Sequence, residues 1–150
     1  MKIALCQINS TVGDFDHNCK KILSFYSNSV DANADIAVFS ELAITGYPPQ
    51  DLLLERSFVE KNVQVLEVLT SAVGNIPMVV GYVHPNGNRL YNSAALLQNG
   101  KISGRYDKVL LPAYDVFDED RYFTPGEKRT LLIAKIGSER ISLGVEVCED

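Results

Sequence analysis

Cys148 has the most distinctive chemical setting in this chain. It follows residues 141–147, in which apolar side chains alternate with small or polar ones as in a half-buried strand. A thiol at the end of a strand can project into a cleft and act as a nucleophile. A free cysteine beside apolar residues is more often buried filler, and Cys6 and Cys19 keep that interpretation.

Two further polar residues stand where strands are expected to end. Glu41 follows the apolar run 36–39, and Lys108 closes the run 101–109. A carboxylate there is costly to bury alone, and a nearby ammonium would keep it ionised. Taken singly, Glu41 fits an ordinary ion pair and Lys108 a solvated strand end. Together with a thiol they supply what amide hydrolysis needs, namely a nucleophile, a proton carrier and a stabiliser of the oxyanion.

Three short runs carry a resemblance that covers the whole chain. Residues 39–42 (FSEL), 108–112 (KVLLP) and 145–150 (VEVCED) resemble the Glu, Lys and Cys motifs of the nitrilase (carbon-nitrogen hydrolase) superfamily. Within this superfamily, residues 41–53 and 111–123 are similar to the glutaminase domains of glutamine-dependent NAD synthetases. The run Tyr91-Asn92-Ser93-Ala94 is similar to the same domains. The resemblance implies that Glu41 is the general base, Lys108 the oxyanion stabiliser and Cys148 the nucleophile toward L-glutamine.

The same resemblance assigns further residues to the site. It implies that Tyr114 binds glutamine, that Tyr47 and Phe117 help form the pocket, and that Glu119 is an additional glutamate near the triad. Simple packing is the alternative for Tyr47 and Phe117. A surface charge in the acidic run 115–120 is the alternative for Glu119.

The resemblance also implies partners outside this sequence. Released ammonia would pass to a synthetase domain that uses ATP and magnesium to convert deamido-NAD into NAD. The chain carries no phosphate-cradling glycine motif, so we expect no cofactor in it. Residues 1–150 are expected to be the first part of the glutaminase domain, with the synthetase domain absent and a homo-oligomer as the assembly.

Two other functions stay open. An amidase for another small amide or nitrile would share the three motifs without an acceptor domain. A non-catalytic piece that contributes sheet edges and helical surface to an oligomer is the alternative from a different class, because an unfinished sheet exposes unpaired edges.

The elements that must position these residues follow from hydrophobic periodicity. We expect two helices, the first with Ile22, Tyr26 and Val30 on one face and the second ending at a left-handed Gly74. Tight turns at 86–87 and 99–100 predict hairpins and hence a mixed sheet. The pattern indicates a mixed α/β domain, and the resemblance implies a nitrilase-type α-β-β-α sandwich that is incomplete in this chain. The helices are expected at 16–32 and 58–73, and the strands at 2–8, 36–39, 78–83, 91–98, 101–109, 131–136 and 141–147.

The amino-acid composition argues against several classes of binding partner for this chain. Fourteen Lys and Arg against 19 Asp and Glu give a formal net charge of −5, and the basic residues are scattered, which argues against nucleic acid. No apolar run approaches the roughly 20 residues that span a bilayer, and no signal peptide is evident, so we expect a cytoplasmic protein without a membrane partner. Three cysteines at wide spacings form neither a zinc pattern nor a disulfide framework.

Overall fold

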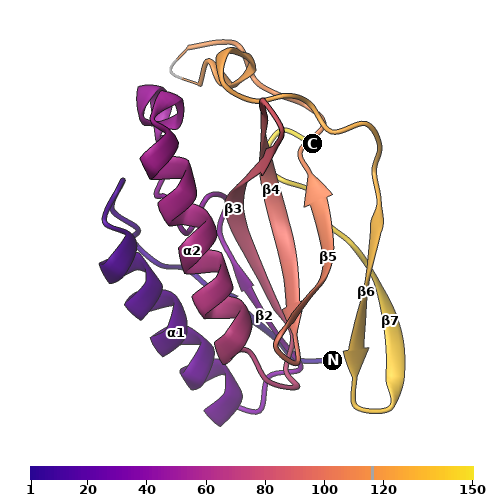
Figure 1. Cartoon of the computed structure of the whole chain (residues 1–150). Helices are drawn as coiled ribbons and strands as arrows, with labels where there is room; N and C mark the ends of the chain where they lie inside the picture. The colour runs from indigo at the N-terminus through magenta and orange to yellow at the C-terminus, as the bar shows by residue number, and fades with distance from the viewer. Residues whose placement is uncertain (116) are drawn as a thin grey trace.

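The fold consists of three layers in a computed structural model that describes residues 1–115 and 117–150 (Figure 1). Helices α1 (Phe15–Asp31) and α2 (Arg56–Ala72) cover one face of a five-stranded sheet, and a separate β-hairpin lies against the other. The sheet strands are β1 (Ile3–Cys6), β2 (Ile36–Phe39), β3 (Met78–Asn86), β4 (Arg89–Gln98) and β5 (Lys101–Asp107), and the hairpin strands are β6 (Leu131–Ile136) and β7 (Glu139–Gly144). Short 3₁₀ helices span Gln50–Leu54 and Glu119–Arg121.

The sheet is mixed, as the sequence predicts. Strands β1, β2 and β3 are parallel because a helix connects each to the next, whereas β3, β4 and β5 are antiparallel and joined by tight turns. Gly87, Asn99 and Gly100 adopt the positive φ that these turns need. The parallel strands bring the ends of β1 and β2 to the same edge of the sheet.

The buried face of α1 differs from the prediction at one position. Ile22 and Tyr26 are buried, but Val30 is 39% exposed and Ser29 is buried instead. Steps of four residues drift around a helix of 3.6 residues per turn, so Ser29, seven residues after Ile22, lies closer to its face than Val30 does. Asp14 caps the start of α1 by accepting from the main-chain N of His17. Neither helix in the described residues is long and apolar enough to cross a membrane.

Helix α2 begins two residues earlier than predicted, and its expected left-handed end at Gly74 is wrong. Gly74 does not have positive φ. The chain leaves the helix in an extended conformation at Val73, and the turn between β4 and β5 satisfies the free carbonyls. Asn99 N donates to Gly74 O at 2.8 Å and Gly100 N donates to Val73 O at 2.9 Å. A tertiary contact therefore replaces the local cap.

The last strand is also shorter than predicted. Strand β7 ends at Gly144, because Gly144 pairs with Leu131, the first residue of β6, and no partner strand continues beyond it. Residues 145–150 leave the hairpin and run toward the end of β5. Cys148 thus lies in a turn four residues after Gly144, the last residue of β7, and not directly at a strand's end.

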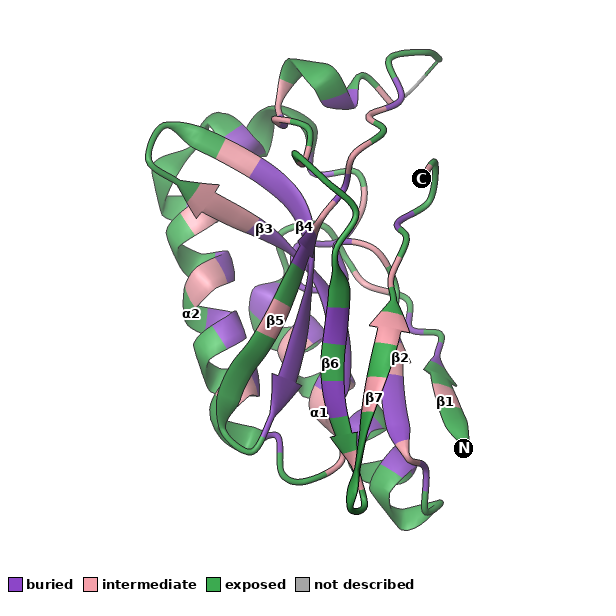
Figure 2. Cartoon of the chain, turned by 90° about the vertical axis from the view of Figure 1, so that its right-hand side faces the viewer, coloured by how far each residue is buried: buried purple, intermediate pink, exposed green. Residues whose placement is uncertain are grey.

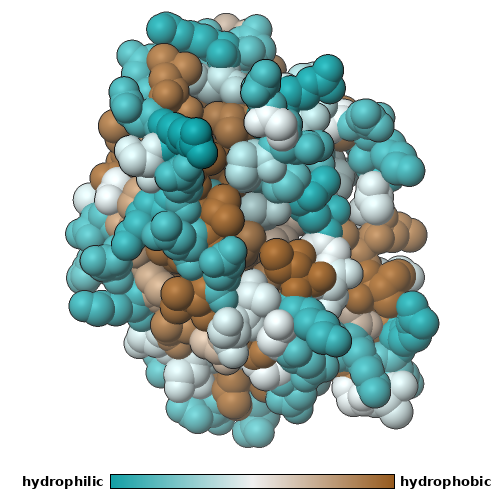
Figure 3. Space-filling view, in the orientation of Figure 1, coloured by the Kyte–Doolittle hydropathy of each residue, from teal (hydrophilic) through white to brown (hydrophobic). Residues whose placement is uncertain are grey.

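Strands covered on both faces are more deeply buried than strands at the edge of the sheet. Strand β4 is buried from Tyr91 to Gln98, since α2 covers one face and the hairpin covers part of the other (Figure 2). Edge strand β1 is less covered, and Leu5 is 80% exposed. Leu131 and Ile133 are also exposed on the hairpin, where apolar atoms reach the surface beside β5 and β6 (Figure 3). Apolar side chains are therefore exposed on this side of the sheet.

Gly81 in β3 determines how closely the segment after β2 can approach the sheet. A Cβ on Gly81 would lie 2.5 Å from the carbonyl oxygen of Ser40 and 2.8 Å from the carbonyl carbon of Glu41. Ile44 N donates to Gly81 O at 3.3 Å, which ties the same segment to β3. The missing side chain is therefore what lets the Glu41 segment lie directly on the sheet.

We predict that Gly81→Ala lowers the free energy of unfolding by about 1–3 kcal/mol, because the added methyl group must displace backbone that has no room to move. Urea denaturation followed by circular dichroism measures the change. Gly74→Ala is the matched control, since nothing lies within 4 Å of a Cβ there. Equal stability of the two variants would contradict the close approach.

Candidate active site

Lys108 is the centre of a buried polar cluster. Its side chain is 0% exposed, and its ammonium donates to Glu41 Oε1 at 2.8 Å and to Glu119 Oε2 at 2.9 Å. Burial alone would lower the pKa of Lys108, but the hydrogen bonds and charges of Glu41 and Glu119 outweigh burial and raise that pKa above its ordinary value. Lys108 therefore stays a cation inside the protein.

Glu41 reaches this cluster from the turn that follows β2. Its Oε1 also accepts from Asn92 Nδ2 at 2.7 Å, so two donors fix the carboxylate. The side chain is 18% exposed and lines a pocket of about 290 Å³ together with residues 8–10 and Tyr47. Glu41 is thus the carboxylate of the cluster that an incoming molecule can reach.

Glu119 forms the buried side of the cluster. It opens the short 3₁₀ helix, is almost fully buried, and accepts from Tyr47 Oη at 3.0 Å. Burial, and then the nearby charge of Glu119, raises the pKa of the Tyr47 hydroxyl. The alternative of a surface charge for Glu119 is therefore wrong, because its carboxylate is buried whereas Asp115, Asp118 and Asp120 are exposed. Tyr47 likewise does more than pack, since its hydroxyl fixes Glu119.

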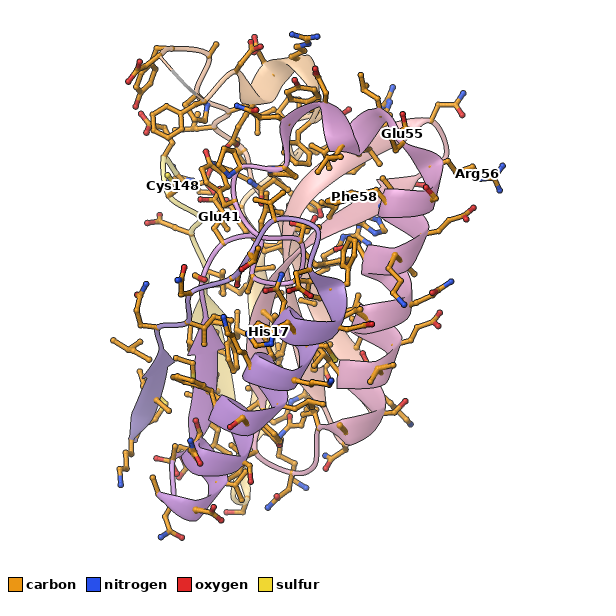
Figure 4. The ribbon with its side chains drawn as sticks, turned by 90° about the vertical axis from the view of Figure 1, so that its left-hand side faces the viewer. His17, Glu41, Glu55, Arg56, Phe58 and Cys148 are labelled. Carbon is orange, nitrogen blue, oxygen red and sulfur yellow. The ribbon has the colours of Figure 1, made fainter. Side chains whose placement is uncertain are left out.

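Cys148 lies on the open side of the same cluster. Figure 4 shows it beside Glu41, although the two residues come from opposite ends of the chain. Its φ of +52° is a left-handed conformation that costs a residue with a side chain roughly 1–2 kcal/mol. Burial raises the pKa of the Cys148 thiol, and the charge of Glu41 adds to the increase while Lys108 opposes it. The resting thiol therefore keeps its proton near neutral pH.

Tyr114 and Phe117 lie outside the buried cluster. Tyr114 is exposed, donates to Glu149 Oε2 at 3.0 Å, and contacts Phe117 edge-on with ring centroids 5.4 Å apart. Glu149 directly follows Cys148, so the Tyr114 hydroxyl contacts the segment that carries the thiol. The structure thus places Lys108, Glu41 and Glu119 in one charged cluster, and the exposed Tyr114 and half-buried Phe117 outside it.

Sequence reasoning missed two residues that hold these groups. Asn92 is 1% exposed, and its amide donates to Glu41 and more distantly to Glu119, while its Oδ1 has no hydrogen-bond partner among the described residues. Asp150 accepts hydrogen bonds from the segment that follows Lys108. Asn92 falls in the run 91–94 that resembles the family, and this resemblance was the sequence signal that could have identified it. Asp150 carried no signal beyond its place after Cys148.

The arrangement is suited to chemistry on a neutral, polarised bond. A thiol and a reachable carboxylate lie beside a fixed ammonium, and such a set of groups can transfer a proton and stabilise an oxyanion. In the described residues, 1–115 and 117–150, no group of three or more His, Cys, Asp or Glu side chains is placed to hold a metal ion.

Known proteins resemble this chain along its whole length. Glutamine-dependent NAD(+) synthetase of Thermotoga maritima is 41% identical over all of this chain, and that of Synechocystis sp. is 40% identical over 99% of it. The chain spans only about a quarter of the length of these relatives.

Solved structures agree in fold. The glutamine-dependent NAD+ synthetase of Acinetobacter baumannii matches with a TM-score of 0.88 and 34% identity, covering 99% of this chain and 27% of that one. An amidase from Nesterenkonia sp. matches with a TM-score of 0.77 and 25% identity, covering 95% of this chain and 54% of that one. The expected nitrilase-type fold is thereby confirmed. The sequence model of the carbon-nitrogen hydrolase family matches residues 2–150. This chain therefore belongs to the carbon-nitrogen hydrolase family.

Proposed function

We propose that this chain carries the catalytic residues of a glutaminase that releases ammonia from L-glutamine. The observation that carries the proposal is the fully buried Lys108 ammonium between Glu41 and Glu119, with the Cys148 thiol on the reachable side. The names of the most similar relatives, all glutamine-dependent NAD(+) synthetases, support glutamine as the amide.

The first half of the proposed reaction forms a thioester. Glu41 takes the proton of the Cys148 thiol as the sulfur attacks the side-chain amide carbon, and the C–S bond forms. The Lys108 ammonium stabilises the oxyanion, a contribution typically worth about 10²–10³ in rate for one donor. Glu41 then gives its proton to the amide nitrogen, the C–N bond breaks, and ammonia leaves.

The second half regenerates the thiol. Water attacks the thioester carbon while Glu41 accepts one of its protons, and the C–S bond breaks to give glutamate. The Cys148 sulfur recovers the proton from Glu41. Because the thiol pKa is raised, the carboxylate beside it must accept the proton at the moment of attack. Asn92 and Lys108 hold Glu41 in the position that this transfer requires.

Tyr114, Phe117 and Glu119 complete the proposed site. The exposed Tyr114 and half-buried Phe117 pack against each other, and Tyr114 holds Glu149, the residue after Cys148, so both rings are suited to contact the body of the substrate. Glu119 supports the site by compensating the charge of Lys108, and Tyr47 holds Glu119. In a full-length protein like its relatives, the ammonia would serve a synthetase domain, and the exposed apolar surface at Leu5 and Leu131 fits contact with further chain or a second copy.

A second candidate is an amidase for another small amide. The E41Q mutant of the Nesterenkonia amidase, 25% identical to this chain, has been captured with the acetamide moiety of fluoroacetamide covalently added at its active-site cysteine. That adduct shows what the fold can hold in a related protein. Competition between glutamine and a simple amide at Cys148 distinguishes the two candidates.

We predict that a diazoketone analogue of glutamine labels Cys148 and that free glutamine suppresses the labelling. Mass-spectrometric peptide mapping measures the reaction, and the buried Cys6 and half-buried Cys19 are internal controls. Suppression by acetamide but not by glutamine would favour the amidase. Labelling of Cys148 that neither amide suppresses would indicate a chain without a working site.

We predict that Glu41→Gln makes the Cys148 thiol more acidic but slows glutamine hydrolysis. The negative charge of Glu41 contributes to the raised pKa of the thiol, so its removal shifts the pH midpoint of Cys148 alkylation downward. Loss of the general base meanwhile lowers the rate of glutamine hydrolysis by about 10²–10⁴-fold. Iodoacetamide kinetics and ammonia release measure the two effects.

Glu55→Gln is the control for this prediction. Glu55 is an exposed carboxylate before α2, and Figure 4 shows it far from Cys148, so its removal should move neither quantity. Unchanged hydrolysis in Glu41→Gln would exclude Glu41 as the base. An upward shift of the alkylation midpoint would contradict the electrostatic argument.

A further inference from the structure

The side chain of Asp150 connects the turn that carries Cys148 to the two residues directly after Lys108. Asp150 Oδ1 accepts from the main-chain nitrogens of Val109 and Leu110, both at 2.9 Å. These are the two residues that directly follow the catalytic lysine of the proposed mechanism. One carboxylate oxygen therefore fixes the backbone that positions the Lys108 ammonium.

The other oxygen of Asp150 holds the turn itself. Asp150 Oδ2 accepts from Val147 N at 3.1 Å and from Tyr106 Oη at 2.9 Å. Val147 directly precedes Cys148, and a main-chain bond from Asp150 N to Val147 O at 3.2 Å closes the same turn. Tyr106 comes from β5 and its ring is fully buried. The turn is thus fastened to the sheet on both sides of the thiol.

From this geometry we propose that Asp150 is a positioning residue that sets the distance between the Cys148 sulfur and the Lys108 ammonium. The inference rests on the proposed function and deepens it. Cys148 has a left-handed backbone conformation that its own residue type disfavours, so neighbouring bonds must maintain it. Asp150 supplies them, and it supplies no group to the substrate.

Only a carboxylate satisfies all four donors. Three of them are main-chain N–H groups that cannot become acceptors, and they approach both oxygens. An asparagine must place its NH₂ against at least one of these N–H groups. Burial opposes the charge of Asp150, but the hydrogen bonds from Leu110, Val147, Tyr106 and Val109 outweigh burial and hold its pKa below the ordinary value.

Amide hydrogen exchange of Asp150→Asn tests whether the turn is held in this way. The substitution should speed exchange in peptides that cover 106–112 and 145–150 and leave peptides of α1 and α2 unchanged. Glu146→Gln is the matched control, because Glu146 is exposed in the same segment and its nearest cation, Arg129, is 3.8 Å away. Equal exchange in both variants would overturn the proposal.

The labelling rate of Cys148 by the diazoketone tests the consequence for the thiol. We expect Asp150→Asn to lower this rate about 10- to 100-fold, as for a small displacement of a reacting group, while the glutamine concentration that suppresses labelling stays nearly constant. A parallel loss of glutamine protection would mean that Asp150 acts on the substrate instead, and would overturn the positioning role.

Two further measurements distinguish failure of the positioning role from failure of the variant to fold and from failure of the proposed function. If Asp150→Asn fails to fold, Tyr106→Phe removes only one bond to Oδ2 and should lower the labelling rate about two- to tenfold; an unchanged rate would overturn the proposal. If the unsubstituted protein shows no selective labelling of Cys148, the proposed function fails, and the exchange data alone decide whether Asp150 holds the turn.

Discussion

The burial of one ammonium group determines much of this structure. An unpaired lysine in the interior would cost several kcal/mol, so Lys108 requires anionic partners that cannot move away. Glu41 comes from the end of β2, Glu119 from a short helix after β5, and Asn92 from β4. These parts of the chain can meet only if the parallel and antiparallel halves of the sheet are joined in the observed order. The fold and the cluster therefore depend on each other.

The charge balance of the cluster explains why a base is needed beside the thiol. One ammonium faces two carboxylates, so the formal charge around Lys108 is already negative before Cys148 loses a proton. A free-standing thiolate would add a second negative charge at the same place. Proton transfer to Glu41 leaves the total unchanged, because the carboxylate becomes neutral as the sulfur becomes charged. This setting differs from that of cysteines activated by a neighbouring cation, whose resting form is the thiolate.

The sequence predicted the parts of the fold that local rules control. Strand and helix order, the mixed sheet and the two tight turns follow from periodicity and from glycine placement, and the positions of Glu41 and Lys108 after strands are visible in the sequence. Tertiary contacts decided the rest: the extended exit from α2 at Val73, the end of β7 at Gly144 and the inward direction of Glu119. Asn92 and Asp150 fall in runs that resemble the family, but their roles could not be assigned, because most of their hydrogen-bond partners lie far away in the sequence.

The contact between Glu41 and Lys108, 67 residues apart, also has a consequence for folding kinetics. Closing such a long loop costs entropy before any contact compensates it, so we expect the pair to form late, once β3, β4 and β5 have assembled. Until then the lysine remains hydrated and the cysteine behaves as an ordinary exposed thiol. Oxidation or alkylation of a nascent or partly folded chain would therefore strike all three cysteines alike, and differences in thiol reactivity would emerge only with the completed sheet.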